Sequence, residues 1–154
     1  MDSATVHPLT NSYTNYVTEI RRLWNGYNKP AIPGETGWDH TFYEPSMPGH
    51  LAQYHNTLWA CLATGTAMSP FWWAFSDMTN DAVLTNQITS LRRFTDGIDF
   101  SKLSGLEPAT IKIANGDAYA MKGNERAFGW VVNPKTDVAG GKVTLSSLKT
   151  ESIN

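Results

Sequence analysis

The feature that most constrains the fold is the nearly continuous apolar run MSPFWWAFSD, residues 68–77. A strand with one face in water alternates apolar and polar residues, whereas a strand covered on both faces is apolar throughout. The run therefore predicts a buried strand of a parallel sheet, ending at the polar residues Ser76 and Asp77. A two-stranded parallel sheet cannot cover both faces of such a run by itself, so we expect the chain to self-associate.

Helical periodicity precedes this run. The apolar residues between 13 and 24 recur at the spacing of one helix face. Asn11 or Ser12 can cap this helix, and Gly26 is expected to end it. The sequence thus predicts a first amphipathic helix close to the start of the chain.

Further strand and helix patterns follow in alternation. A short strand is expected from Ala31 to Glu35, because the preceding proline favours extended geometry. A second helix is expected from His50 to Ala63, with a glycine stop just beyond it. Thr79 or Asn80 is expected to cap a third helix that ends near Gly97. This alternation of helices and buried strands indicates an α/β fold.

The pattern changes beyond Leu106. The segments ATIKIA, AYAMK, RAFGWVV and KVTLSSL predict short strands, separated by the turn sequences NGD, KGNE and AGG. We therefore expect two regions: an α/β region over residues 1–100 and a small antiparallel β region over residues 101–154.

Two predicted strand ends carry residues suited to binding a sugar. One end presents Glu35 and Trp38, and the other presents Trp72, Trp73 and Asp77. Ligand-binding groups gather at the carboxyl ends of parallel strands, and a helical crossover between the two strands would make them neighbours. Because the C–H faces of sugars pack on flat aromatic rings, the sequence predicts a carboxylate beside sugar platforms.

A carboxylate in this position has two interpretations. Retaining glycosyl transfer needs two carboxyl groups about 5–5.5 Å apart, one of which is the nucleophile. Glu35 has the setting of such a nucleophile, since its flanking glycines would let a substrate approach closely. Most single glutamates, however, are capping or salt-bridged loop residues, and the residues alone slightly favour that role.

Three motifs change this balance. KPAIPGETGW, HNTLWACLATG and SPFWWAF together resemble the final third of a clan A glycoside hydrolase barrel, over roughly residues 12 to 97. Those enzymes are (β/α)8 retaining glycosidases, and the resemblance is closest to the cellulase-, mannanase- and β-galactosidase-like branches. It implies a partial TIM barrel, with strand–helix units that resemble barrel strands 7 and 8. It also implies that Glu35 is the nucleophile and that Trp72 or Trp73 is the sugar platform.

Two histidines are further candidates for binding the sugar. His55 and Asn56 match the helix motif of the resembling family, either as sugar ligands or as packing residues, and His40 follows the Glu35 motif. The spacing of the histidines fits no metal-ligand template, so no metal is expected. No glycine-rich phosphate loop follows a strand, so no cofactor is expected. Cys61, the single cysteine, lies in an apolar helical pattern that predicts a buried thiol.

The chain departs from the resembling family in one important respect. A complete barrel takes about 250 residues, whereas this chain holds only two of the strand–helix units. The family's acid/base glutamate, preceded by asparagine, has no counterpart ahead of Glu35. The candidates for this role within the chain are Glu44, Asp39 and Asp77, each of which is more often a loop charge or a helix cap. A neighbouring subunit could supply them.

Charge and hydropathy exclude some partners. A formal net charge of -2 gives no electrostatic reason to bind nucleic acid or an anionic membrane, and no window has the apolar length of a membrane span. The first residues, MDSATVHPLT, lack the basic and apolar regions of a secretory signal. We therefore expect a cytoplasmic location by default and leave the compartment open.

The function expected from these observations is that of a retaining β-glycosidase acting on short β-linked glycosides. Its site would be completed in a homo-oligomer or by an N-terminal barrel fragment. The alternatives are a noncatalytic carbohydrate-binding or structural remnant of a glycoside hydrolase, and one fragment of a split enzyme.

Overall fold

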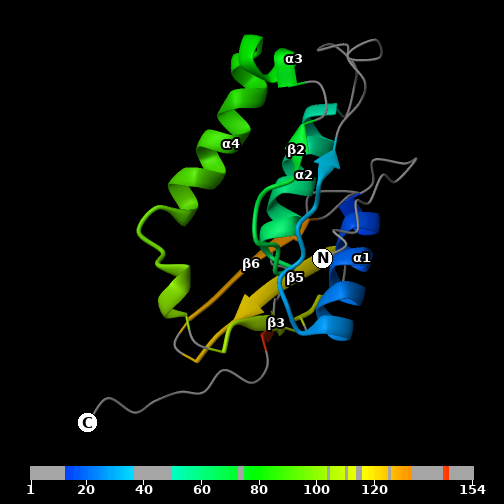
Figure 1. The fold of residues 1–154 in the computed structure, drawn as a ribbon, viewed down its shortest axis with the longest axis vertical. Coiled ribbons are helices and arrows are strands. Elements are labelled where there is room, and N and C mark those ends of the chain that lie inside the picture. The colour runs from blue at the N-terminus through cyan, green and yellow to red at the C-terminus, as the bar shows by residue number, and fades with distance from the viewer. Residues whose placement is uncertain are drawn as a thin grey trace. The chain divides into compact units, whose positions relative to one another are not determined.

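A computed structural model describes residues 13–36, 50–72, 75–103, 105–109, 111–113, 116–124, 126–132 and 144–145. The chain divides into two compact units, Met1–Ile98 and Asp99–Asn154, and each is described by itself below. Helices and a parallel strand pair form the first unit, and antiparallel strands dominate the second (Figure 1). The mixed α/β class expected from the sequence is confirmed.

Helix α1 spans Tyr13–Tyr27. The expected end at Gly26 is wrong by one residue, because the helix continues to Tyr27 and stops where Asn28 adopts a positive φ of 51°. Asparagine tolerates this left-handed conformation better than most residues. The expected caps, Asn11 and Ser12, lie outside the described residues. The buried face of α1 carries Tyr16, Val17 and Ile20.

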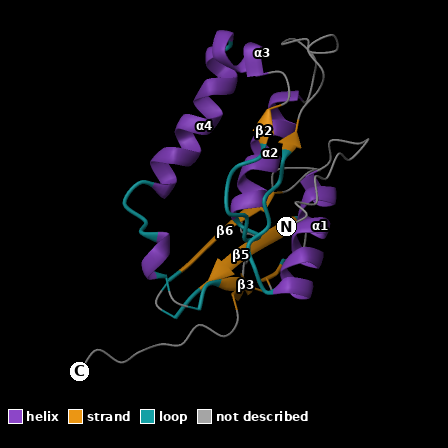
Figure 2. Ribbon diagram, in the orientation of Figure 1, coloured by secondary structure: helices purple, strands orange, loops and turns teal. Residues whose placement is uncertain are grey.

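Two short parallel contacts stand where a continuous strand was expected. Ala31 forms an isolated bridge with Thr66, and β1, Glu35–Thr36, pairs in parallel with β2, Phe71–Trp72. A strand running unbroken from Ala31 to Glu35 is therefore wrong. Pro33 lies between the two contacts and has no N–H to donate to a ladder, so the pairing breaks there. The expectation that the two strands are parallel neighbours is confirmed (Figure 2).

The apolar run 68–77 is not a single strand either. Only Phe71–Trp72 pair in β2, and helix α3, Phe75–Asn80, follows after two residues that are not described. Ser76 and Asp77 therefore lie in a helix rather than at a strand end. A short apolar run fits a buried strand and a buried helix equally well, because its hydrophobicity carries no periodicity that separates the two.

Helix α2, His50–Leu62, lies between α1 and α4 (Figure 1). On one side it contributes Tyr54 and Leu58 to a cluster with two leucines of α4. On its other side Cys61 packs with Tyr16 and Ile20 of α1 and with Ala31. The expected stop after α2 is confirmed, since the glycine at position 65 has a φ of 95°. The core of the first unit is thus built around α2.

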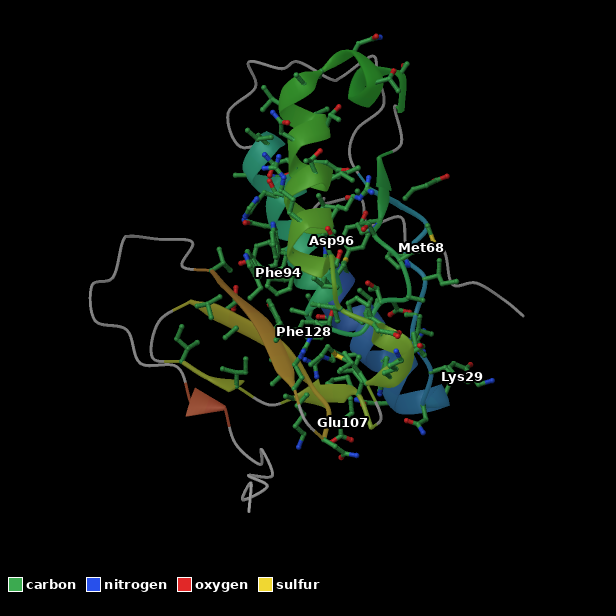
Figure 3. All side chains as sticks on the ribbon, turned by 90° about the vertical axis from the view of Figure 1, so that its left-hand side faces the viewer. Lys29, Met68, Phe94, Asp96, Glu107 and Phe128 are labelled. Atoms are coloured by element: carbon green, nitrogen blue, oxygen red, sulfur yellow. The ribbon has the colours of Figure 1, made fainter. Side chains whose placement is uncertain are left out.

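Helix α4 spans Ala82–Thr95, and its N-terminal cap is not one of the two residues expected from the sequence. Asp81 is the N-cap, and its Oδ1 accepts a hydrogen bond of 2.7 Å from the Val83 backbone N–H. Thr79 and Asn80, the expected caps, are wrong because both already belong to α3. The expected end near Gly97 is confirmed. Phe94 and Asp96 mark this end of the helix in Figure 3.

The second unit is antiparallel, as expected, but the segment ATIKIA is not one strand, because Ala109 ends a strand at 107–109 that the sequence did not predict and Ile111 begins another. A three-stranded sheet has the order β3-β5-β6, and a separate pair joins β4 to β7. A short 3-10 helix, Phe100–Lys102, precedes the strands. The strands are β3 (Glu107–Ala109), β4 (Ile111–Lys112), β5 (Asp117–Lys122), β6 (Ala127–Val132) and β7 (Thr144–Leu145).

Close backbone packing marks the centre of this sheet. Gly129 of β6 pairs with Ala120 of β5, which is almost fully buried. A Cβ atom at Gly129 would lie 2.6 Å from the Tyr119 carbonyl oxygen, closer than real Cβ contacts. A glycine is therefore required at position 129. At the edge of the sheet, Lys122 Nζ lies 3.3 Å from Oε1 of Glu107, which is labelled in Figure 3.

Candidate functional site

The candidate site is centred on Glu35 in β1, directly opposite Phe71 of β2 in the ladder. Glu35 is partly buried, and the next residue, Thr36, is only 4% exposed. The Thr36 side chain hydrogen-bonds the Tyr16 side chain on α1. Because consecutive side chains of a strand point to opposite faces, we expect the Glu35 carboxylate on the face opposite the Thr36 side chain.

Tyr16 also holds the backbone of this strand. Its hydroxyl donates a hydrogen bond of 2.7 Å to the Glu35 carbonyl oxygen. Burial raises the pKa of Tyr16 above its ordinary value of 10.0, a hydrogen bond with Thr36 opposes this shift, and electrostatic interactions with Cys61 and Glu35 add to it. The hydroxyl therefore keeps its proton at neutral pH and acts as the donor.

His55 lies where α2 packs on α4. Its Nδ1 is 2.8 Å from Oε1 of Gln87, and its ring centroid is 6.0 Å from that of Trp59. Trp59 in turn meets the ring of Phe94 edge-on, with centroids 5.2 Å apart. The sequence left open whether His55 binds sugar or packs, and its described contacts are with Trp59 of its own helix and with Gln87 of α4. A substrate-binding role for His55 and for Asn56, the next residue on α2, stays a prediction.

Other candidate residues are placed only by their backbone or not at all. Trp72 lies in β2 opposite Thr36, and Asp77 lies in α3. Nothing is described of either side chain. Five further candidates lie outside the described residues, so their roles stay predictions: Trp38, Asp39, His40, Glu44 and Trp73. The structure thus places Glu35 opposite β2, and the roles of Glu44, Asp39 and Asp77 stay predictions.

Sequence reasoning did not identify Tyr16 and Thr36 as part of this site. Tyr16 is one of several apolar residues in the stripe of α1, and Thr36 is an ordinary residue of the GETG motif. The hydrogen bond from Tyr16 to Glu35 joins residues nineteen positions apart, and it depends on how α1 packs on β1. No sequence pattern predicts that packing.

Cys61 is another ionisable residue among those described in the first unit. Cys61 is a buried free thiol, as expected, and burial raises its pKa well above the ordinary value of 9.0. Within the segments that the structure describes, no three His, Cys, Asp or Glu side chains gather as metal ligands would. None of the helices described there is long and apolar enough to cross a membrane.

Comparison of the chain with protein-family models, with curated proteins and with solved structures finds no match. The resemblance to clan A glycoside hydrolases therefore rests on the motif residues themselves, above all on Glu35 and the two flanking glycines in KPAIPGETGW.

Proposed function

We propose that this chain is part of a retaining β-glycosidase acting on short β-linked glycosides, with Glu35 as its nucleophile. The observation that carries the proposal is the parallel pairing of β1 with β2, in which Glu35 stands opposite Phe71. Alternation along β1 would put the carboxylate on the face opposite Thr36, which supports a substrate-facing role. The GETG motif would supply the chemistry, and the pairing with β2 sets the register of Glu35 in the sheet.

The proposed architecture is a partial TIM barrel whose two strand–helix units resemble barrel strands 7 and 8. A whole barrel takes about 250 residues, so under this proposal the remaining strands lie outside these 154 residues. In the part of the chain that the structure describes, the β1–β2 sheet has only two strands. We propose that further copies of the chain complete it as a homo-oligomer, with an N-terminal barrel fragment as the alternative partner.

The proposed reaction proceeds in two steps through a covalent intermediate. The Glu35 carboxylate attacks the anomeric carbon while an acid protonates the departing glycosidic oxygen. Water then attacks the glycosyl–enzyme ester, assisted by the same group acting as a base, and the Glu35 carboxylate leaves. The acid/base group must stand about 5–5.5 Å from the nucleophile, and Glu44, Asp39 and Asp77 are its candidates.

Substrate contacts in this proposal come from aromatic rings around the carboxylate. Trp38, Trp72 and Trp73 would stack on the C–H faces of the sugar, and His40 would hydrogen-bond its hydroxyl groups. One small unit offers little length for a polymer groove, so the proposed substrates are short glycosides that are cleaved from an end.

A panel of chromogenic aryl β-glycosides tests the proposal, with Glu35→Gln as the variant. We expect the wild type to release the chromophore and the variant to lose about 10³-fold or more in kcat. Glu19→Gln is the matched control, because Glu19 lies in the same unit and is paired with Arg22 on α1. A 2-deoxy-2-fluoro-glycoside should label Glu35 covalently, which peptide mass spectrometry detects. An inactive wild type, or full activity in Glu35→Gln, would contradict the proposal.

The second candidate is a noncatalytic carbohydrate-binding remnant. It is favoured by the lack of an asparagine–glutamate pair ahead of Glu35. Calorimetric binding of an oligosaccharide without any hydrolysis would support this candidate over the enzyme. Size-exclusion chromatography with light scattering tests the proposed homo-oligomer independently of the two candidate functions. An active monomer would contradict the homo-oligomer.

A further inference from the structure

We infer that Tyr16 is a positioning residue for Glu35, and that its hydroxyl holds the end of β1 so that the carboxylate stays on the face away from α1. The inference rests on the proposed function, in which Glu35 is the nucleophile. Tyr16 touches neither substrate nor reacting atoms in this account. It acts through the backbone of the residue that does.

The geometry around Tyr16 carries the inference. Its hydroxyl donates to the Glu35 carbonyl oxygen at 2.7 Å and also hydrogen-bonds the side chain of Thr36. One phenol thus contacts both residues of β1. Tyr16 is 1% exposed and packs with Ile20 and Cys61, so its ring has little freedom to turn away from the strand.

The need for such a tie follows from the shortness of β1. The strand has only two residues, and Pro33 separates it from the bridge at Ala31. Few ladder hydrogen bonds therefore restrain the peptide that carries the Glu35 side chain. A rotation of that peptide would move the carboxylate, and a displacement of about 1 Å at a reacting group can cost about 10²-fold in rate.

Tyr16→Phe tests the inference, because it removes the hydroxyl and keeps the ring. Tyr54→Phe is the matched control: Tyr54 is also 1% exposed, belongs to the same unit and lies in the cluster on the other side of α2. Four quantities are measured for the full chain: kcat and KM on the best chromogenic glycoside, the rate of inactivation by the fluoroglycoside, and hydrogen exchange of residues 31–36.

We expect Tyr16→Phe to lower kcat and the inactivation rate together by about tenfold, with less than about a twofold change in KM. Exchange in residues 31–36 should rise, while the helix α2 peptides keep their protection. Tyr54→Phe should leave kcat, the inactivation rate and exchange in residues 31–36 near their wild-type values. A merely structural role for the Tyr16 hydroxyl would lower thermal stability without this selective loss in the attack step.

Two results would overturn the inference while leaving the proposed function intact. One is wild-type kcat and exchange in Tyr16→Phe, and the other is an equal loss in both variants. A wild type that hydrolyses no glycoside contradicts the proposed function, and the positioning role falls with it. In that case raised exchange in residues 31–36 of Tyr16→Phe would still support the tie between Tyr16 and the strand.

Discussion

The two units of the chain are stabilised in different ways. The first buries large side chains that helices far apart in sequence bring together, including Tyr16, Tyr54 and Leu58. Its strands β1 and β2 have two residues each. The second unit pairs β5 with β6 along six residues, and its most buried described residues are Met121, Ala120 and Ala109. The first unit therefore depends on side-chain packing between helices, whereas the second adds a long ladder between neighbouring strands.

This difference matters for the candidate site. Glu35 stands on a strand too short to hold itself, so its position depends on the helices that pack against it. A site on β5 or β6 would have a ladder to support it. Changes that break the packing of the first unit, or the ladder of the second, should therefore act on different parts of the molecule.

The largest effect is expected from Leu58→Ala in the first unit. Leu58 is 0% exposed and packs with Leu84 and Leu91 of α4. Truncation leaves a cavity, so the free energy of unfolding should fall by about 2–5 kcal/mol, measured by chemical denaturation. Leu51→Ala, on the same helix at 40% exposure, is the control and should cost less than about 1 kcal/mol. Equal losses in the two variants would mean that α2 packing does not dominate this unit.

The next largest effect should appear at alkaline pH, again in the first unit. Burial raises the pKa values of Cys61 and Tyr54 above their ordinary values of 9.0 and 10.0. Above those values the unfolded chain loses protons that the folded chain keeps, so stability is fully present below pH 9 and falls as pH rises. The loss per group is at most about 1.4 kcal/mol for each pH unit.

Unfolding free energies between about pH 8 and about pH 11 measure this loss. Cys61→Ala should remove the part of the decline that begins near pH 9, and Tyr54→Phe the part that begins near pH 10. A decline that keeps its shape in both variants would assign the alkaline sensitivity to other groups.

A smaller effect is expected from Gly129→Ala in the second unit. The added Cβ would meet the Tyr119 carbonyl oxygen at 2.6 Å, and this backbone atom cannot move cheaply. We expect a loss of about 1–3 kcal/mol, with the greatest rise in hydrogen exchange in β5 and β6. Gly26→Ala, near the end of α1, has open space around its Cβ and should gain up to about 1 kcal/mol. A neutral Gly129→Ala would show that the ladder can part to admit a methyl group.

Much of the fold could be predicted because it repeats a local pattern. The helices α1, α2 and α4 follow from apolar residues at helical spacing, and the strands of the second unit follow from alternating residues between turn sequences. The run 68–77 predicts a single strand because unbroken apolarity has no period, whereas the structure divides it between β2 and α3. The expected cap of α4 lies too early in the chain because the sequence pattern does not reveal α3.

The candidate site divides in the same way. The motif around Glu35 could be found along the chain, and the parallel pairing with β2 followed from the order of the elements. The two hydrogen bonds of Tyr16 could not be predicted from the sequence, because many apolar residues of α1 share its helical spacing. The rotation and tilt of α1 over β1 decide which of these residues contacts the strand.

The sequence by itself determined α1, α2 and α4 and the two regions of the chain, and it singled out Glu35, although β1 begins at that residue instead of ending there. Each of these depends on residue types and spacings within a single element or turn. Only the tertiary structure decided that Tyr16 bonds the Glu35 backbone and that His55 meets Gln87. Such bonds join elements that are distant along the chain, and helix packing selects one partner among many chemically similar ones.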